Sequence, residues 1–232
     1  MGELLEEAFR VMRKRNFDLT ALIPANPSLF EYYRRHGYTE VFDYTLVEEE
    51  LPEVFTPSEG IKLSIVDEDS VEVTYPYFNR KLKERTCCIL HSKEDFITSI
   101  IEFRQDDGET VQATNKEGKI VGMAFLYPSI DHVYIKEFIY DSEQIREAML
   151  QEIMLRHRMK KVQYIAPSQL PETHRMGMGM ILNRERSSQL WLAKNPKFPM
   201  TQEGLDKMDI QTLTRHLLNY TEKLPYMSLM HD

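Results

Sequence analysis

Apolar residues near the start of the chain recur at the spacing of a helix. Leu5, Ala8, Phe9 and Met12 stand at positions i, i+3, i+4 and i+7, with charged residues between them. This spacing places all four on one face of an amphipathic helix over residues 3–15.

The following segments predict a strand, a helix and a second strand. Residues 18–23 have strand composition and stop at Pro24. A short helical pattern then opens at Pro27 and ends at Gly37, and residues 41–47 alternate between apolar and polar as a strand does. A helix that connects two strands in this way is typical of an α/β fold.

The chain beyond residue 60 adds further alternation and further helical periodicity. The short connection around Lys116–Gly118 favours a hairpin, so we expect the strands between residues 109 and 140 to pair antiparallel. The pattern predicts strands at residues 62–66, 87–90, 109–114, 119–127, 132–140 and 162–166, a mixed or helical segment at 68–85, and helices at 92–103, 142–158, 187–194 and 209–220.

Three methionines alternate with other residues late in the chain. Met176, Met178 and Met180 would face one side of a strand, either as core residues or as a flexible apolar surface for a substrate or partner. The segment Gly177–Gly179, by its glycines, instead favours a turn. The two interpretations overlap on the same residues and both stay open at this point.

Composition separates the chain into parts. Residues 48–60 hold five acids, two prolines and a glycine, which is typical of a linker. We therefore expect a first part at residues 1–50, a linker at 51–60, a second part at 61–186 and a helical tail at 187–232.

Charge and composition exclude several classes of protein. Lys and Arg total 29 and Asp and Glu total 37, so the net charge of −8 has the wrong sign for a general nucleic-acid binder and suits a cationic small substrate better. No stretch approaches the roughly 20 apolar residues of a membrane span. Cys87 and Cys88 are adjacent and cannot form an ordinary structural disulfide with each other, which fits a cytoplasmic protein.

Three short motifs carry a resemblance to a known family. They are Tyr33-Arg-Arg-His-Gly-Tyr38 after a strand and a proline, Phe78-Asn-Arg-x-x-x-x-Arg85, and His174-Arg-Met-Gly-Met178. In this order they resemble the Gcn5-related N-acetyltransferases, and among these the tandem enhanced intracellular survival branch. The resemblance implies an α/β fold. It consists of an acetyltransferase-like mixed sheet with central antiparallel strands and flanking helices at residues 61–186, preceded by the C-terminal half of a first acetyltransferase domain at 1–50.

The resemblance also implies which residues act. Tyr33 would be the acid that protonates the thiolate of coenzyme A, and the α-carboxylate of Asp232 would be the base that takes the amine proton. Ile23 and Asn26 would contact acetyl-coenzyme A, the co-substrate, and the acceptor would be a small primary amine. The alternatives are a packed aromatic residue for Tyr33 and a frayed, exposed chain end for Asp232.

Two departures from the family pattern affect the expected function. The Arg/Gln-x-x-Gly-x-Gly/Ala loop that binds the coenzyme pyrophosphate should lie directly before residue 3 and is absent. The tail has room for only a remnant of a sterol-carrier-like domain. The chain therefore resembles an N-terminally truncated acetyltransferase, inactive by itself, and the alternative is a non-catalytic binding or oligomer-assembly module.

The sequence also bears on metal binding and on self-association. The seven histidines form no His-x-His or His-Glu-x-x-His pattern, so we expect no metal. In the truncated arrangement the strand at residues 18–23 loses its neighbour and the apolar face of the first helix loses its cover. Such surfaces recruit other chains, so we expect a homo-oligomer or a mobile segment at residues 1–45.

Overall fold

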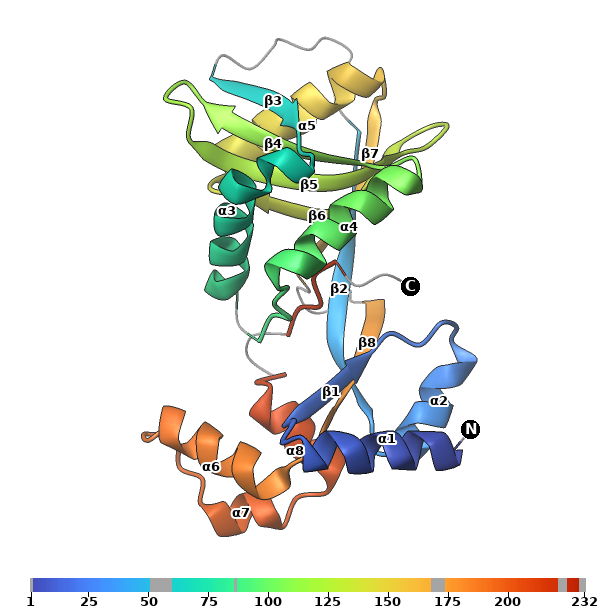
Figure 1. The fold of residues 1–232 in the computed structure, drawn as a ribbon, viewed down its shortest axis with the longest axis vertical. Coiled ribbons are helices and arrows are strands. Elements are labelled where there is room, and N and C mark those ends of the chain that lie inside the picture. The colour runs from blue at the N-terminus through green and yellow to red at the C-terminus, as the bar shows by residue number, and fades with distance from the viewer. Residues whose placement is uncertain (1, 51–59, 86, 168–173, 221–224, 230–232) are drawn as a thin grey trace. The chain divides into compact units, whose positions relative to one another are not determined.

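The structure is a computed structural model that describes residues 2–50, 60–85, 87–167, 174–220 and 225–229 (Figure 1). Contacts within the chain group it into two compact units. The first unit comprises Met1–Asp43 and Ser168–Asp232, and the second comprises Tyr44–Pro167. The domain limits proposed from the sequence are sequential and stay a prediction, whereas the first unit is built from both ends of the chain.

The first unit contains a small sheet with helices beside it. In strand order β1-β8-β2, the strand β8 from late in the chain stands between two strands from its beginning. The elements of this unit are α1 (Gly2–Lys14), β1 (Leu19–Leu22), α2 (Ser28–Arg35), the first part of β2 (Thr39–Glu50), β8 (His174–Ile181), α6 (Arg184–Lys194), α7 (Gln202–Asp206) and α8 (Ile210–Leu217).

The second unit contains the later part of β2 and a larger sheet in the order β2-β7-β6-β5-β4-β3. Its pairs are antiparallel except β6 and β7, which are parallel. The further elements of this unit are β3 (Ile61–Ile65), a short 3-10 helix (Glu68–Ser70), α3 (Val71–Glu84), α4 (Lys93–Gln105), β4 (Glu109–Asn115), β5 (Ile120–Pro128), β6 (Val133–Tyr140), α5 (Glu143–His157) and β7 (Lys161–Pro167).

Helices cover both faces of the sheet in the second unit (Figure 1). On one face α5 packs closely because β5 carries Gly122, where an added Cβ would lie 2.1 Å from the sulfur of Met149. On the other face α3 contributes Phe78 and α4 contributes Phe103 to an aromatic cluster around Phe125, with ring centroids 6.0 Å and 5.2 Å from that of Phe125. The mixed α/β fold class with central antiparallel strands, predicted from the sequence, is confirmed.

One predicted strand is wrong. Residues 87–90 were expected to form a short buried strand, but Cys87 has a φ of 51°, in the left-handed region, and Leu90 is 47% exposed. The apolar run therefore follows a turn, and a left-handed residue interrupts the extended backbone that a strand needs. Of the predicted linker, residues 51–59 lie outside the described part of the chain, and Glu48–Glu50 belong to β2.

The turn expected at Gly177–Gly179 is also wrong, because both glycines lie inside β8. β8 pairs antiparallel with β1, from Leu19 opposite Ile181 to Leu22 opposite Met178. The strand at residues 18–23 thus keeps a neighbour, contrary to expectation. Sequence separation conceals this partner, since the two strands lie about 160 positions apart in the chain.

The apolar face of α1 is covered as well. Phe9 is 6% exposed and packs in a cluster with Tyr38, Met178, Met180 and Leu182. This core role supports the first interpretation of the methionine run. The unsupported helix face inferred from the sequence is therefore wrong, and self-association stays a prediction without that reason behind it.

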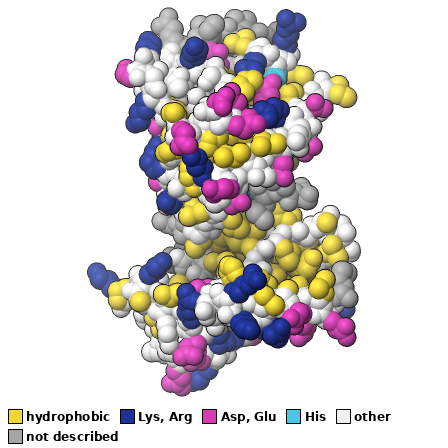
Figure 2. All heavy atoms as spheres, in the orientation of Figure 1, with side chains coloured by type: hydrophobic (Ala, Val, Ile, Leu, Met, Phe, Trp, Pro, Cys, Tyr) yellow, Lys and Arg dark blue, Asp and Glu magenta, His cyan; other side chains and the backbone are white. Residues whose placement is uncertain are grey.

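Within the described residues, the structure shows neither a helix long and apolar enough to cross a membrane nor a group of three or more potential metal ligands. On the face drawn in Figure 2, acidic and basic side chains are interspersed among the described residues.

Candidate functional site

Tyr33 lies in α2, the short helix that connects β1 and β2. Its ring makes edge contacts with Tyr32, at a centroid distance of 5.2 Å, and with Tyr38, at 5.6 Å. The side chain is half-buried against the cluster that contains Met178 and Leu22. Within the described part of the chain, its hydroxyl makes no hydrogen bond. A phenol held by its ring with an unengaged hydroxyl has the form that a proton donor needs.

The neighbouring phenols differ from Tyr33 in their surroundings. The Tyr38 hydroxyl lies 3.1 Å from Thr20 Oγ1, and burial raises the pKa of Tyr38 above its ordinary value. The Tyr32 hydroxyl is buried and has no hydrogen-bond partner among the described residues. Tyr32 and Tyr33 are both half-buried, but of the two only Tyr33 has a hydroxyl that is neither buried nor hydrogen-bonded, counting only the described residues.

The two residues expected to contact the coenzyme follow β1. Ile23 is half-buried directly after the strand, and Asn26 is exposed in the turn before α2. The side-chain oxygen of Asn26 accepts hydrogen bonds from the backbone N–H of Ser28, at 3.1 Å, and from its hydroxyl, at 2.5 Å. Asn26 therefore organises the start of α2, and its role toward a coenzyme stays a prediction.

The last described residues of the chain return to the first unit's sheet. Met227 is 1% exposed, and its sulfur would lie 2.8 Å from a Cβ added at Gly177 in β8. The same added Cβ would lie 3.2 Å from the carbonyl oxygen of Leu22, at the end of β1. Asp232 itself lies outside the described residues. The segment that precedes it is nevertheless brought to the strand end next to Ile23.

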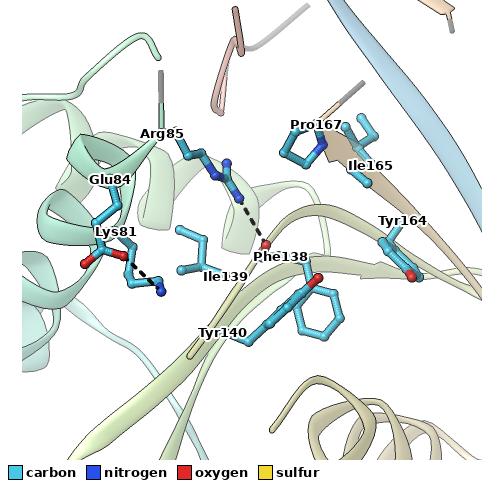
Figure 3. A pocket seen from close by; sticks show the side chains of 10 residues that line it. Lys81, Glu84, Arg85, Phe138, Ile139, Tyr140, Tyr164, Ile165 and Pro167 are labelled. Carbon is cyan, nitrogen blue, oxygen red and sulfur yellow. Dashed lines mark hydrogen bonds and ion pairs between the residues drawn. The ribbon is translucent and has the colours of Figure 1, made fainter. Parts of the chain in front are cut away.

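In the second unit, the two parallel strands separate and leave a cavity (Figure 3). Their pairing runs from Val133–Val162 to Ile135–Tyr164, and beyond it the strands diverge around a cavity of about 220 Å³. The lining residues come from β6, β7 and the end of α3: Lys81, Glu84, Arg85, Phe138, Ile139, Tyr140, Tyr164, Ile165, Ala166 and Pro167.

A buried ion pair lies beside the cavity. Nη1 of Arg85 donates to Oε1 of Glu137 at 2.8 Å. Nη2 donates to the carbonyl oxygen of Phe138 at 3.3 Å (Figure 3). Glu137 is fully buried and Arg85 is 20% exposed at its side chain. The resemblance singled out Arg85 by its motif, but the partner on β6 appears only in the structure.

Side chains of the protein itself occupy the N-terminus of α5, the helix that follows β6, where a phosphate could otherwise bind. Ser142 caps the N-terminus of α5 by accepting from the Ile145 N–H at 3.4 Å, and Glu143 occupies the first turn. Asp141, directly before the cap, lies 3.5 Å from Lys81 and accepts a hydrogen bond from Tyr77 at 3.2 Å. Two carboxylates at a helix N-terminus repel the anion that such a site would otherwise attract.

Three arginines of the first unit converge on one buried carboxylate, which sequence reasoning missed. Glu40 is 4% exposed and pairs with Arg34, with Arg175 at 3.2 Å and with Arg215 at 3.7 Å. Burial by itself raises the pKa of Glu40, but the hydrogen bond and charge of Arg34, together with the charge of Arg175, lower it below its ordinary value. The three arginines come from α2, β8 and α8, so no local sequence motif predicts that they lie together.

The lowered pKa of Glu40 predicts an acid-dependent loss of stability. Because the folded state holds this proton more weakly than the unfolded state, the contribution is present above the ordinary pKa of 4.5 and is lost as the pH falls below it. Urea unfolding measures the free energy of unfolding at pH 7 and at pH 4. Its decrease between the two pH values should be smaller for Glu40→Gln than for the unaltered chain. Equal differences in both would contradict a role for Glu40.

The chain is similar to known proteins in its structure and not in its sequence. No protein-family model matches it, and no curated protein matches its sequence. Solved structures match with low identity. A conserved protein of unknown function from Enterococcus faecalis has a TM-score of 0.62 at 16% identity over 77% of this chain, and a GCN5-related N-acetyltransferase from Anabaena variabilis has 0.60 at 14% over 80%. Eis1 from Mycobacterium abscessus has a TM-score of 0.51 at 11% over 81%.

These likenesses establish the fold. The chain has the fold of the GCN5-related N-acetyltransferases, as the motif at Tyr33–Tyr38 implied. It covers 49% of the Enterococcus protein, 51% of the Anabaena protein and 53% of Eis1, so it spans about half the length of the structures it matches. The tandem branch, the truncation and the roles of Tyr33, Asp232, Ile23 and Asn26 stay predictions.

Proposed function

We propose that the chain is part of a GCN5-related N-acetyltransferase that transfers an acetyl group from acetyl-coenzyme A to a small primary amine. The observation that carries the proposal is the meeting of two distant segments at β1 and β8. Tyr33 packs in the cluster that contains Leu22 and Met178, and Met227 lies against Gly177, the neighbour of Met178. Tyr33, the expected acid, and the described segment that contains Met227 therefore lie beside the same strand, on opposite faces of it, because adjacent side chains alternate along a strand.

The chemistry follows from these positions. The amine attacks the carbonyl carbon of the thioester, so a C–N bond forms while the C–S bond breaks. The α-carboxylate of Asp232 takes the proton from the attacking amine, and the Tyr33 hydroxyl gives its proton to the departing thiolate. Ile23 and Asn26, after β1, line the path of the coenzyme in this proposal.

The net charge of the protein favours one class of partner. A protein of net charge −8 attracts cationic amines and repels nucleic acid, so we propose a small amine as partner and neither nucleic acid nor membrane. We also propose a cytoplasmic location and a homo-oligomer. No metal enters the reaction as proposed, because a phenol and a carboxylate supply both proton transfers.

A second candidate function is a non-catalytic binding or assembly role for the second unit. The observation in its favour is the N-terminus of α5, where Asp141, Ser142 and Glu143 occupy the place that a phosphate-binding loop would take. The cavity between β6 and β7 then binds a smaller ligand or supports the fold, without coenzyme chemistry.

A binding measurement tests whether the chain binds acetyl-coenzyme A by itself. The 232 residues contain no Arg/Gln-x-x-Gly-x-Gly/Ala pattern, and α5 is capped by its own side chains, so we expect weak binding or none. Isothermal calorimetry with the 232-residue chain should give a dissociation constant well above the micromolar range. A value of about 1 μM, near −8 kcal/mol, would show that one of the units holds the coenzyme without that loop.

The transferase activity needs its own assay. A form of the protein that carries the pyrophosphate loop should release free thiol from acetyl-coenzyme A only when a primary amine is added. Spermidine serves as the amine and its fully N-methylated analogue as the control. Equal thiol release with both compounds would contradict amine acetylation.

A further inference from the structure

The arginines that contact Glu40 form one cluster at the surface of the first unit. Arg34, Arg175 and Arg215 belong to α2, β8 and α8, which all lie within this unit. Arg34 and Arg175 both donate to Oε1 of Glu40, and Nη2 of Arg215 lies 3.7 Å from Oε2. Glu40 is buried, whereas the side chains of the three arginines are 35%, 66% and 45% exposed. The three guanidinium groups therefore meet at one carboxylate and remain open to solvent.

This cluster carries a surplus of positive charge. The buried carboxylate balances only one of the three guanidinium charges. Beside the cluster, Glu31 pairs with Arg34 and with Arg35, so these neighbours add one charge of each sign. The carboxylate of Asp43 accepts a hydrogen bond from Tyr220 at 2.6 Å and lowers the surplus further. Counted over the described residues, one to two positive charges remain unbalanced at this surface.

Contacts within the protein hold the guanidinium groups in place and leave donors over. Arg34 is bound between two carboxylates. Nε of Arg215 donates to Oγ1 of Thr39 at 2.9 Å, and its guanidinium carbon lies 5.1 Å from the centroid of the Tyr220 ring. A guanidinium carries five N–H donors. Hydrogen bonds to described residues use two donors of Arg34 and one each of Arg175 and Arg215, so several donors remain for a ligand.

We propose that Arg34, Arg175 and Arg215 form a binding site for the phosphoryl group of a small ligand. Paired N–H groups of guanidinium match the oxygens of phosphate, and a phosphoryl group carries a charge of about −1.5 to −2 at pH 7, close to the local surplus. Because the three side chains converge on one carboxylate, a compact anion fits them better than an extended acidic peptide. The site is independent of the proposed acetyl transfer, and its test needs no turnover.

Titration of the full chain with inorganic phosphate, followed by isothermal calorimetry, tests the site. We expect saturable binding with a dissociation constant below about 1 mM. Methyl phosphate serves as a second titrant: equal affinity for both assigns the site to a phosphate carried by a larger molecule, and a preference for inorganic phosphate assigns it to the free ion. Acetate, with a single charge, should bind about tenfold more weakly. A dissociation constant above about 1 mM for both phosphates, or acetate binding as tight as phosphate, overturns the inference.

Single substitutions separate a local site from the overall charge of the protein. Arg175→Met and Arg215→Met each remove one guanidinium and should weaken phosphate binding about tenfold, as expected for the loss of a charge-assisted hydrogen bond. The matched control is Arg10→Met, which changes the net charge equally. Arg10 is 64% exposed and pairs with Glu7 alone among the described residues, so its loss should leave the affinity unchanged. Equal affinities in Arg175→Met and Arg10→Met overturn the site.

Arg175→Met keeps the test decisive if Arg215→Met fails to fold. Arg215 also contacts Thr39, whereas Arg175 is the most exposed of the three and leaves two arginines beside Glu40 when it is removed. Thermal unfolding gives a second measurement, because a ligand that binds only the folded state raises the Tm. Phosphate should raise the Tm of the unaltered chain and of Arg10→Met, and raise that of Arg175→Met clearly less. An equal rise in all three overturns the inference.

Discussion

Tyr33→Phe should lower kcat by about a hundredfold in a form of the protein that turns over acetyl-coenzyme A, as expected for the loss of a general acid. The ring contacts with Tyr32 and Tyr38 involve no hydroxyl, so phenylalanine keeps the packing. The KM for acetyl-coenzyme A should change little, because in the proposed reaction the phenol acts on the leaving thiolate only as the bond breaks. Steady-state kinetics with thiol detection measures both constants.

The matched control is the adjacent residue. Tyr32→Phe removes a buried hydroxyl that has no hydrogen-bond partner among the described residues, so it should leave kcat unchanged and the fold at least as stable. A kcat near that of the unaltered enzyme in Tyr33→Phe, or equal losses in both variants, would remove Tyr33 from the proposed role.

Replacing Arg85 by methionine should destabilise the protein by about 3 kcal/mol, because a fully buried carboxylate then loses the counterion 2.8 Å away. Methionine preserves most of the side-chain length, so the loss reports the charge more than the packing. Urea unfolding followed by circular dichroism measures it. Arg85 lines the cavity between β6 and β7, so Arg85→Met should also widen this cavity.

Arg80→Met, in the helix that ends directly before Arg85, provides the comparison. Arg80 is 49% exposed and pairs with Glu84 at 2.6 Å and Asp141 at 3.7 Å, so its removal should cost less than about 1 kcal/mol. An equal decrease in the free energy of unfolding for the two variants would show that burial does not make the Arg85–Glu137 pair more stabilising than an exposed pair.

Much of the secondary structure was predictable because it depends on local spacing. The apolar face of α1 and the hairpin around Gly118 each arise from residues that lie close together in the chain. The strand expected at residues 87–90 failed because a short apolar run fits a strand and a turn equally well, and the left-handed Cys87 decides between them.

The candidate site was predictable in part. The motif from Tyr33 to Tyr38 placed an aromatic residue after a strand and identified a possible acid. The partners of that segment could not be foreseen, because β8 and Met227 come from the other end of the chain. The three arginines around Glu40 are hidden for the same reason, since each stands on a different element.

The sequence by itself determined most of the helices and strands, because periodicity acts over neighbouring residues, and its motifs implied the fold class. The tertiary structure alone decided that β8 pairs with β1, that Gly177 receives Met227, and that Glu137 is paired inside the second unit. These features depend on contacts between residues far apart in the chain, and the free energy of burying them together leaves no local pattern in the sequence.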